Sequence, residues 1–236
     1  MPRKARMYLP GVPCHVISRG NNRDACFYSD DDYQFYLECL DDACRKYQVA
    51  LHAYVLMTNH VHLLLTPVSE GGISKVMQSV GRRYVQYINL NYKRSGTLWE
   101  GRHKASLVDA DEYLLACYRY IELNPVRANM VSHPAEYRWS SYRVNAGLRE
   151  RRNLREHEVY TRLGSDADSR HMAYCDLFSF DIDSDVIKDI RRCASFSMPL
   201  GSSRFQSQIE RALGRKLGHA GRGRPRKPHK SYENQS

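Results

Sequence analysis

Two neighbouring apolar stretches with a two-residue gap constrain the fold of this chain more than any other feature. Residues 50–57 and 60–65 are mostly apolar, and only Thr58 and Asn59 lie between them. Two short apolar runs joined by so few residues are typical of a β-hairpin. The sequence therefore predicts an antiparallel sheet that contains this hairpin.

The segments on either side of the hairpin complete a regular order of strands and helices. Further strands are expected at residues 13–19 and within 97–108, and helices at 29–47, 74–92 and 111–123. Asp109 can cap the last helix with Glu112 in capping-box position, and the Asn124-Pro125 step should end or kink it. This order predicts an α+β fold, the ferredoxin-like split βαβ antiparallel sheet. Two helices would cover one sheet face and leave the other for a site beside a further helix.

The composition changes after Tyr142, which predicts three regions. We expect a folded domain at residues 1–145, a helical extension at 146–213 and a basic tail without stable structure at 214–236. Helical segments at 184–194 and 202–213 are compatible with a small DNA-binding appendage. Residues 214 to 230 include seven Lys or Arg and no Asp or Glu.

The chain of 236 residues carries a formal net charge of +10 and contains 17 tyrosines. This positive charge favours a polyanionic partner, because neutralising phosphates releases counterions. Aromatic side chains between Arg and Lys can also stack on unpaired bases, although many tyrosines simply pack in cores. Composition therefore favours a nucleic acid partner.

Cysteine spacing and hydropathy bear on the cellular compartment. The seven cysteines are scattered without any Cys-x-x-Cys motif, which argues for reduced thiols and against a disulfide framework or zinc finger. No apolar run has the length of a membrane span, and no signal-peptide core follows the basic N-terminus. We expect a cytoplasmic protein without a membrane partner.

His60 and His62 stand at the head of the second hairpin strand. Side chains alternate between the two faces of a strand, so both imidazoles should project from one face. Two imidazoles this close can bind a single divalent metal ion. They can equally be polar outward positions on a half-buried strand, and the spacing alone does not separate these alternatives.

The helix at 111–123 places four side chains on one face, namely Tyr113, Cys117, Tyr120 and Asn124. If this helix lies beside the histidines, Asn124 can complete a metal site and Tyr120 can place its hydroxyl near the metal-bound group. Tyr118 is an alternative nucleophile, but it points about 160° away from Tyr120, which is on the side of Asn124.

This set of residues suits attack of a tyrosine on a phosphodiester. A divalent ion would bind the non-bridging oxygens of the phosphate and neutralise developing charge. An ordinary tyrosine has a pKa of about 10, so activation needs a nearby cation or base. Imidazole nitrogens and an amide oxygen suit Mg²⁺ or Mn²⁺ as the cofactor.

Several motifs, in this order, resemble the single-tyrosine HUH transposases, and among them the REP-associated tyrosine transposases. The resemblance covers about residues 8–145. It rests on Ser18-Arg19-Gly20-Asn21-Asn22-Arg23, Asn59-His60-Val61-His62-Leu63, Leu98-Trp99-Glu100-Gly101-Arg102, Tyr118-Arg119-Tyr120-Ile121-Glu122-Leu123-Asn124-Pro125-Val126-Arg127-Ala128 and Trp139-Ser140-Ser141-Tyr142.

The resemblance implies a bacterial, nucleoid-associated DNA transposase. Its 1–145 domain would cleave and rejoin hairpin-containing single-stranded DNA through a 5′-phosphotyrosine and leave a free 3′-OH. Carried over by position, Tyr120 is the nucleophile and the metal ligands are His60, His62 and Asn124. The expected DNA contacts of this domain are Arg19, Asn21, Arg102 and Lys104.

The basic tail resembles an AT-hook in its Arg-Gly-Arg-Pro core. An extended segment of this kind can enter a narrow A·T minor groove, where negative potential attracts arginine. The tail residues expected to contact DNA are Arg222, Arg224, Arg226 and Lys227. A solvated basic tail that adds phosphate affinity is the alternative.

Two other functions remain open. One is a non-catalytic, domesticated regulator that binds DNA hairpins, and the other is a nucleotide hydrolase that uses the histidine pair. The hydrolase would leave Tyr120 and the basic tail without a role. The sequence does not define the hairpin, the guide bases or the metal ion. It also does not define whether the protein is a monomer or a homodimer. Nor does it define whether the Tyr120 helix completes the site of its own chain (in cis) or that of a partner chain (in trans).

Overall fold

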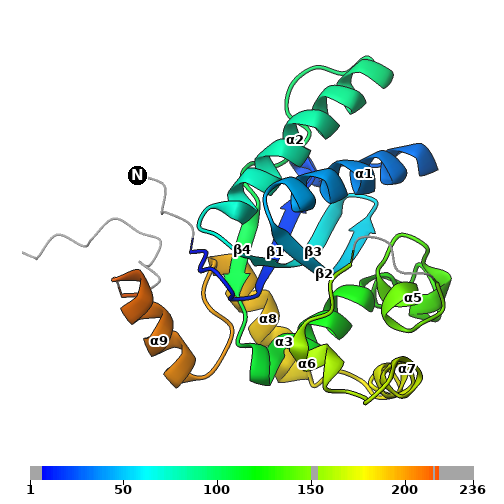
Figure 1. Ribbon diagram of the computed structural model, residues 1–236. Coiled ribbons are helices and arrows are strands. Elements are labelled where there is room, and N and C mark those ends of the chain that lie inside the picture. Colours follow the sequence, from blue (N-terminus) through cyan, green and yellow to red (C-terminus); the bar gives the residue numbers. More distant parts are fainter. Residues whose placement is uncertain (1–6, 150–153, 215, 218–236) are drawn as a thin grey trace, which may run out of the picture.

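The computed structural model describes residues 7–149, 154–214 and 216–217. Its centre is an antiparallel sheet with the strand order β2-β3-β1-β4 (Figure 1). The strands are β1 (Cys14–Arg19), β2 (Val49–Met57), β3 (His60–Pro67) and β4 (Lys104–Leu107). The predicted hairpin is the β2–β3 pair, and the predicted α+β split βαβ fold is confirmed.

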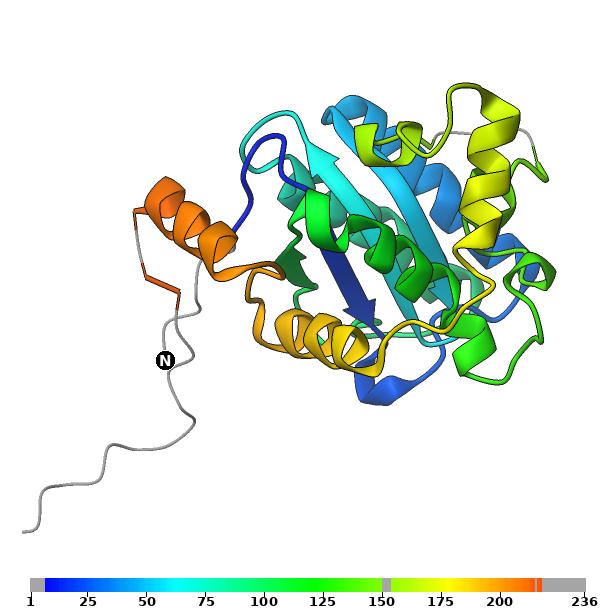
Figure 2. The ribbon, with the colours of Figure 1, turned by 90° about the horizontal axis from the view of Figure 1, so that it is seen from below.

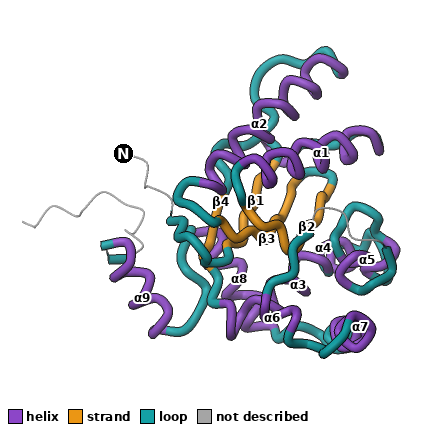
Figure 3. The backbone as a smooth tube through the Cα atoms, in the orientation of Figure 1, coloured by secondary structure: helices purple, strands orange, loops and turns teal. Residues whose placement is uncertain are grey.

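Helices cover both faces of the sheet. α1 (Asp30–Lys46) and α2 (Gly72–Asn91) lie together on one face, and α3 (Ala110–Glu122) lies on the other with α8 (Ser184–Phe196). Figure 2 shows the sheet between these layers, and Figure 3 shows its strands as the central band of the molecule. A site can therefore form between the sheet and the α3 layer.

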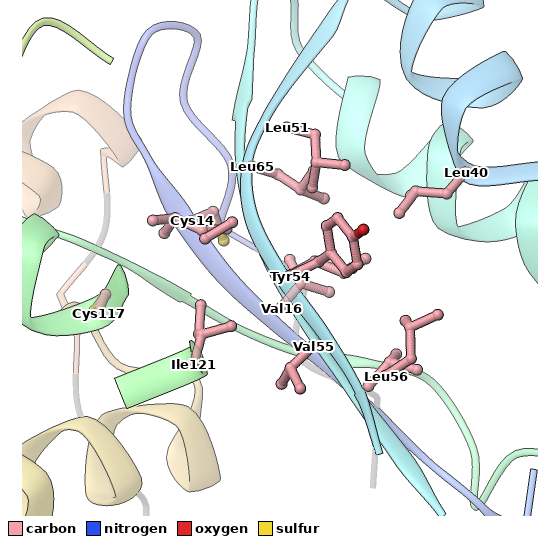
Figure 4. Packing of buried hydrophobic residues seen from close by; sticks show 14 of the residues in the cluster. Cys14, Val16, Leu40, Leu51, Tyr54, Val55, Leu56, Leu65, Cys117 and Ile121 are labelled. Atoms are coloured by element: carbon pink, nitrogen blue, oxygen red, sulfur yellow. The ribbon is translucent and has the colours of Figure 1, made fainter. Parts of the chain in front are cut away.

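Strand alternation explains which side chains enter which layer. Leu51, Tyr54 and Leu65 lie on the side of the sheet that meets Leu40 of α1, and all four are buried (Figure 4). On the opposite side, Ile121 of α3 lies toward the sheet (Figure 4). Burial of these apolar surfaces is the main stabilising contribution to the two layers, at about 25 cal/mol per Å² removed from water.

Acidic residues predicted the N-termini of α1 and α3, and of these two only α1 has a capping box. Ser29 and Asp32 form a capping box at the start of α1. Asp109 is the N-cap of α3, but its side chain makes no capping hydrogen bond, so the predicted capping box with Glu112 is wrong. The reason is a distant segment, because the Asp109 carboxylate lies beside Gly201.

The chain beyond α3 folds back onto the same sheet. Its helices are α4 (Asn124–Arg127), α5 (Tyr142–Asn145), α6 (Glu158–Thr161), α7 (Ala167–Asp176), α8 and α9 (Ser203–Leu213), with a short 3-10 turn at Pro134–Glu136. Another 3-10 turn, Asn21–Arg23, follows β1. α8 contacts α3, β1 and β4. Leu200 also pairs with the edge of the sheet, donating to Leu107 O at 2.7 Å and accepting from Asp109 N at 2.8 Å. The helical segment at 184–194 thus packs as part of the α3 layer.

No helix in the described ranges is long and apolar enough to span a membrane.

Candidate active site

The sheet face toward α3 carries the histidines. In the register of β1 and β3, Arg19 is paired with His60 and Ile17 with His62. Directly paired residues share a face, so these side chains project together toward α3. They line a cleft of about 550 Å³ between the sheet, α3 and α8. The polar residues that line it are Arg19, His60, His62, Glu100, Arg102, Lys104, Tyr120, Asn124, Arg127, Arg191 and Ser195.

Tyr120 reaches this cleft from α3, and its side chain is largely buried there. Its ring meets the rings of His15 and His62 edge-on, with centroids 5.8 Å apart in each case. The Arg127 guanidinium lies over the same ring, 4.6 Å from its centroid. Tyr118 instead packs against Tyr160 on the outer side of α3. Of the two tyrosines considered as nucleophiles, Tyr120 is the one at the cleft.

Hydrogen bonds orient the two predicted metal ligands. His60 Nδ1 lies 2.6 Å from Asn59 Oδ1, and His62 Nδ1 lies 2.8 Å from His15 Nε2. An amide oxygen only accepts, so His60 Nδ1 carries the proton and His60 Nε2 keeps its lone pair. In both rings Nε2 is left as the nitrogen that can bind an ion, which is the usual arrangement around metal-binding imidazoles.

The environment keeps these imidazoles neutral, the form that binds metals. Burial lowers the pKa of His15 to about 4. Burial and, to a lesser extent, Arg19 lower the pKa of His60 to about 4. Burial, followed by the neighbouring His15, lowers the pKa of His62 well below its usual range. Protons therefore do not compete with a cation near neutral pH.

Asn124 stands where α3 ends, one residue before Pro125. Its Nδ2 donates to the backbone oxygens of Tyr120 at 2.8 Å and Ile121 at 3.3 Å. These bonds use the amide nitrogen. Oδ1 is therefore the atom of Asn124 that could coordinate a metal ion in the cleft. Two imidazole nitrogens and one amide oxygen fit a divalent ion. No group of three or more His, Cys, Asp or Glu that could hold a metal is present in the described part of the chain.

The cleft is strongly basic. Five cationic side chains line it, Arg19, Arg102, Lys104, Arg127 and Arg191, against the single carboxylate of Glu100. Such a surface suits phosphate groups.

The residues expected to contact DNA fall into three groups. Arg19, Arg102 and Lys104 line the cleft. Asn21 does not line it, because it lies in the adjoining turn, where its backbone N donates to Leu98 O at 2.9 Å. The tail residues Arg222, Arg224, Arg226 and Lys227 lie outside the described residues.

The sequence assigned no role to Arg127 and Arg191, which line the cleft, or to His15, which contacts His62 and Tyr120. His15 could have been suspected, since it shares the β1 face of Arg19. Arg127 follows Tyr120 by seven residues, which returns it to the same side of the helix end. Arg191 carries no local signal, because only the packing of α8 on the sheet brings it to the cleft.

Comparison with known proteins identifies the family of the domain that holds this cleft. Residues 10–124 match the family model described as IS200-like transposase. This domain belongs to the IS200-like transposases. The match spans β1 to Asn124 and therefore contains His60, His62 and Tyr120.

One solved structure shares the fold of this chain. The structure of a REP-associated tyrosine transposase bound to a REP hairpin aligns with a TM-score of 0.55 and 16% identity, covering 67% of this chain and 93% of that chain. A candidate transposase from Deinococcus radiodurans R1 aligns with 24% identity and a TM-score of 0.37, covering 51% of this chain and 96% of that chain. None of the curated protein sequences matches this chain.

Proposed function

We propose that this IS200-like transposase cleaves and rejoins single-stranded DNA through Tyr120, with a divalent ion as cofactor. The observation that carries the proposal is the single basic cleft in which β3 presents His60 and His62 while α3 presents Tyr120 and Asn124. The substrate class is single-stranded DNA containing a REP-like hairpin. The fold shared with a transposase bound to such a hairpin supports this choice.

Cleavage begins when Tyr120 Oη attacks the phosphorus of the scissile phosphodiester. Tyr120 Oη loses its proton as its bond to phosphorus forms, the bond to the 3′-oxygen breaks, and the departing oxygen takes up a proton. The product is a 5′-phosphotyrosine and a free 3′-OH. Because the phosphate remains esterified, a 3′-OH can attack it in turn and rejoin the DNA without hydrolysis. A divalent ion held by His60, His62 and Asn124 would supply Lewis-acid stabilisation of charge on the phosphate.

The other side chains of the cleft hold and orient the reacting groups. Arg127 Nη1 is buried and has no hydrogen-bond partner among the described residues. A phosphate oxygen beside Tyr120 would supply that partner in a charge-assisted hydrogen bond. Arg19, Arg102 and Lys104 can bind the flanking phosphates, and His15 orients His62.

Tyr120→Phe tests the nucleophile. Single-stranded DNA from the flanks of the protein's own gene is incubated with and without Mn²⁺, and covalent adducts are resolved on a denaturing gel. Wild type should form an adduct that requires the metal and disappears with chelator. Tyr120→Phe should form none while binding the hairpin within about twofold of wild type, because only one oxygen is lost.

Tyr118→Phe is the matched control, since it makes the same change on the outer side of the same helix. It should retain the adduct. An adduct that persists in Tyr120→Phe would show that another residue is the nucleophile. Metal-dependent cleavage by wild type would exclude the regulator that only binds hairpins.

A further inference from the structure

A second cavity lies on the opposite side of the sheet from the histidines. It has a volume of about 340 Å³ and is bounded by β1, α1, α2 and the loop at 99–103. Ser18 marks the side, because it is paired with Val61 and so faces away from His60 and His62. Cavities of this size bind small organic groups in many proteins.

The walls of this cavity combine an aromatic ring with polar groups. Trp99 is half-buried, and its ring packs near those of Tyr36 and Tyr84, with centroids 6.3 Å and 6.2 Å away. α2 contributes Ser74, Met77, Gln78 and Gly81, which the helical spacing places on one side of the helix. A flat aromatic ring with polar edges matches this combination, because it can stack on Trp99 while its edges meet hydroxyl and amide groups.

One buried polar atom at this cavity lacks a partner. Tyr36 lines the cavity and is 1% exposed, and its hydroxyl has no hydrogen-bond partner among the described residues. A buried hydroxyl without a partner costs stability, so an occupant with an acceptor or donor would satisfy it. Nucleobases carry such groups along their edges.

The second cavity adjoins the catalytic cleft. Gly101 and Arg102 line both spaces, so the loop at 99–103 forms the ridge between them. Gly101 has φ +146°, a conformation that favours glycine, and the ridge carries no side chain at this point. A strand whose phosphate lies in the catalytic cleft can thus cross the ridge and place the next base on its far side.

We propose that this cavity binds one unpaired nucleobase of the DNA strand held in the catalytic cleft. The proposal rests on the proposed function for its substrate class. Arg102 at the cavity supplies positive charge near the phosphate of the bound nucleotide. Base capture beside the cleft would fix the strand position relative to Tyr120.

Gly81 offers a way to fill the cavity without disturbing the helix. A Cβ added there meets no atom within 4 Å, and alanine or methionine is a better helix former than glycine. Gly81→Met should place a long side chain in the cavity, whereas Gly81→Ala adds one methyl group and serves as the control. Thermal melting monitored by circular dichroism establishes that both variants are folded.

The probes are abasic oligonucleotides about 12 nucleotides long, a length within the range of single-stranded DNA sites. One is fully abasic, and four others carry a single adenine, cytosine, guanine or thymine. All five probes have the same backbone charge. The difference in affinity between a single-base probe and the fully abasic probe therefore measures the contribution of the base. At least one base should raise wild-type affinity about tenfold, and Gly81→Ala should keep the gain. Gly81→Met should lose it.

A second measurement uses the chain's two tryptophans. In Trp139→Phe, Trp99 is the remaining tryptophan, and its fluorescence should be quenched by the single-base probe but not by the abasic one. No gain from any base in wild type, or a gain that survives Gly81→Met, would overturn the proposal. The adduct assay is independent of both measurements. Base-dependent binding without an adduct would refute the catalytic function and leave the base site standing.

Discussion

His15 is the residue through which the sheet orients His62. Its Nε2 lies 2.8 Å from His62 Nδ1, and it is fully buried. Removing a side chain that holds a metal-binding imidazole typically lowers metal affinity by about 10- to 100-fold. His15→Ala should therefore raise the Mn²⁺ concentration for half-maximal adduct formation by about that factor, with the rate recovered at saturating metal.

The control for this prediction is His133→Ala, which removes an exposed histidine away from the cleft. Direct titration with Mn²⁺ should give the same ratio of affinities as the adduct assay. An unchanged metal requirement in His15→Ala, or a rate loss that saturating metal fails to restore, would show that His15 does not orient the ligand.

A site residue could be predicted from the sequence where its position follows from the periodicity of its own strand or helix. His60 and His62 share a face because strand periodicity is a property of adjacent residues, and Tyr120 with Asn124 follows likewise from helical periodicity. The structure brings these four side chains into one cleft, while their catalytic roles stay predictions. His15 needed the register of β1 on β3, which no local pattern contains.

At the scale of elements, Glu122 links the helix of Tyr120 to the segments that follow it. Its carboxylate is fully buried and accepts hydrogen bonds from Ser141 Oγ, from Asn145 Nδ2 at 2.8 Å and from Tyr174 Oη at 2.6 Å. Burial raises the pKa of Glu122 to about 7, against the lowering effect of these three donors. α3 is thus held at its C-terminal end by α5 and α7.

Glu122→Leu should lower the free energy of unfolding by about 2–4 kcal/mol, because three buried donors lose their acceptor. Glu122→Gln retains a carbonyl oxygen of similar shape and should cost about 1 kcal/mol or less. Urea unfolding followed by circular dichroism measures both. Equal losses in the two variants would contradict this account, because the glutamine amide has nearly the shape of the carboxylate and still offers an acceptor oxygen to the three donors.

The elements themselves were largely predictable. The four strands and the helices α1, α2 and α3 lie where apolar periodicity and turn residues predicted them. The capping box at Asp109 failed because Gly201 approaches from a segment about ninety residues further along the chain. Capping preferences describe a helix start without tertiary contacts. Here the backbone N of Asp109 donates to Leu200 O, so a tertiary contact occupies the helix start.

At the scale of the whole molecule, the cleft that holds His60, His62 and Tyr120 is assembled from both ends of the described chain. β1 and β3 supply the histidine face, while α8 supplies Arg191 and Ser195 about 130 residues after β3. α8 also contacts α3 and β4, and residue 200 pairs with the edge of β4. The order of the elements along the chain did not predict that α8 completes the cleft, because no sequence motif links α8 to the strands that it contacts.

This arrangement predicts that the family-matched domain does not fold stably alone. A chain ending at residue 149 lacks α6 to α9, which exposes the outer side of α3, including the buried Tyr118, and leaves Glu122 without Tyr174. Such exposure should abolish the cooperative thermal transition and with it adduct formation. A chain ending at residue 217 keeps every described helix and should melt within a few degrees of the full chain. Cooperative melting and adduct formation by the 149-residue chain would show that the C-terminal helices are dispensable for the fold and the cleft.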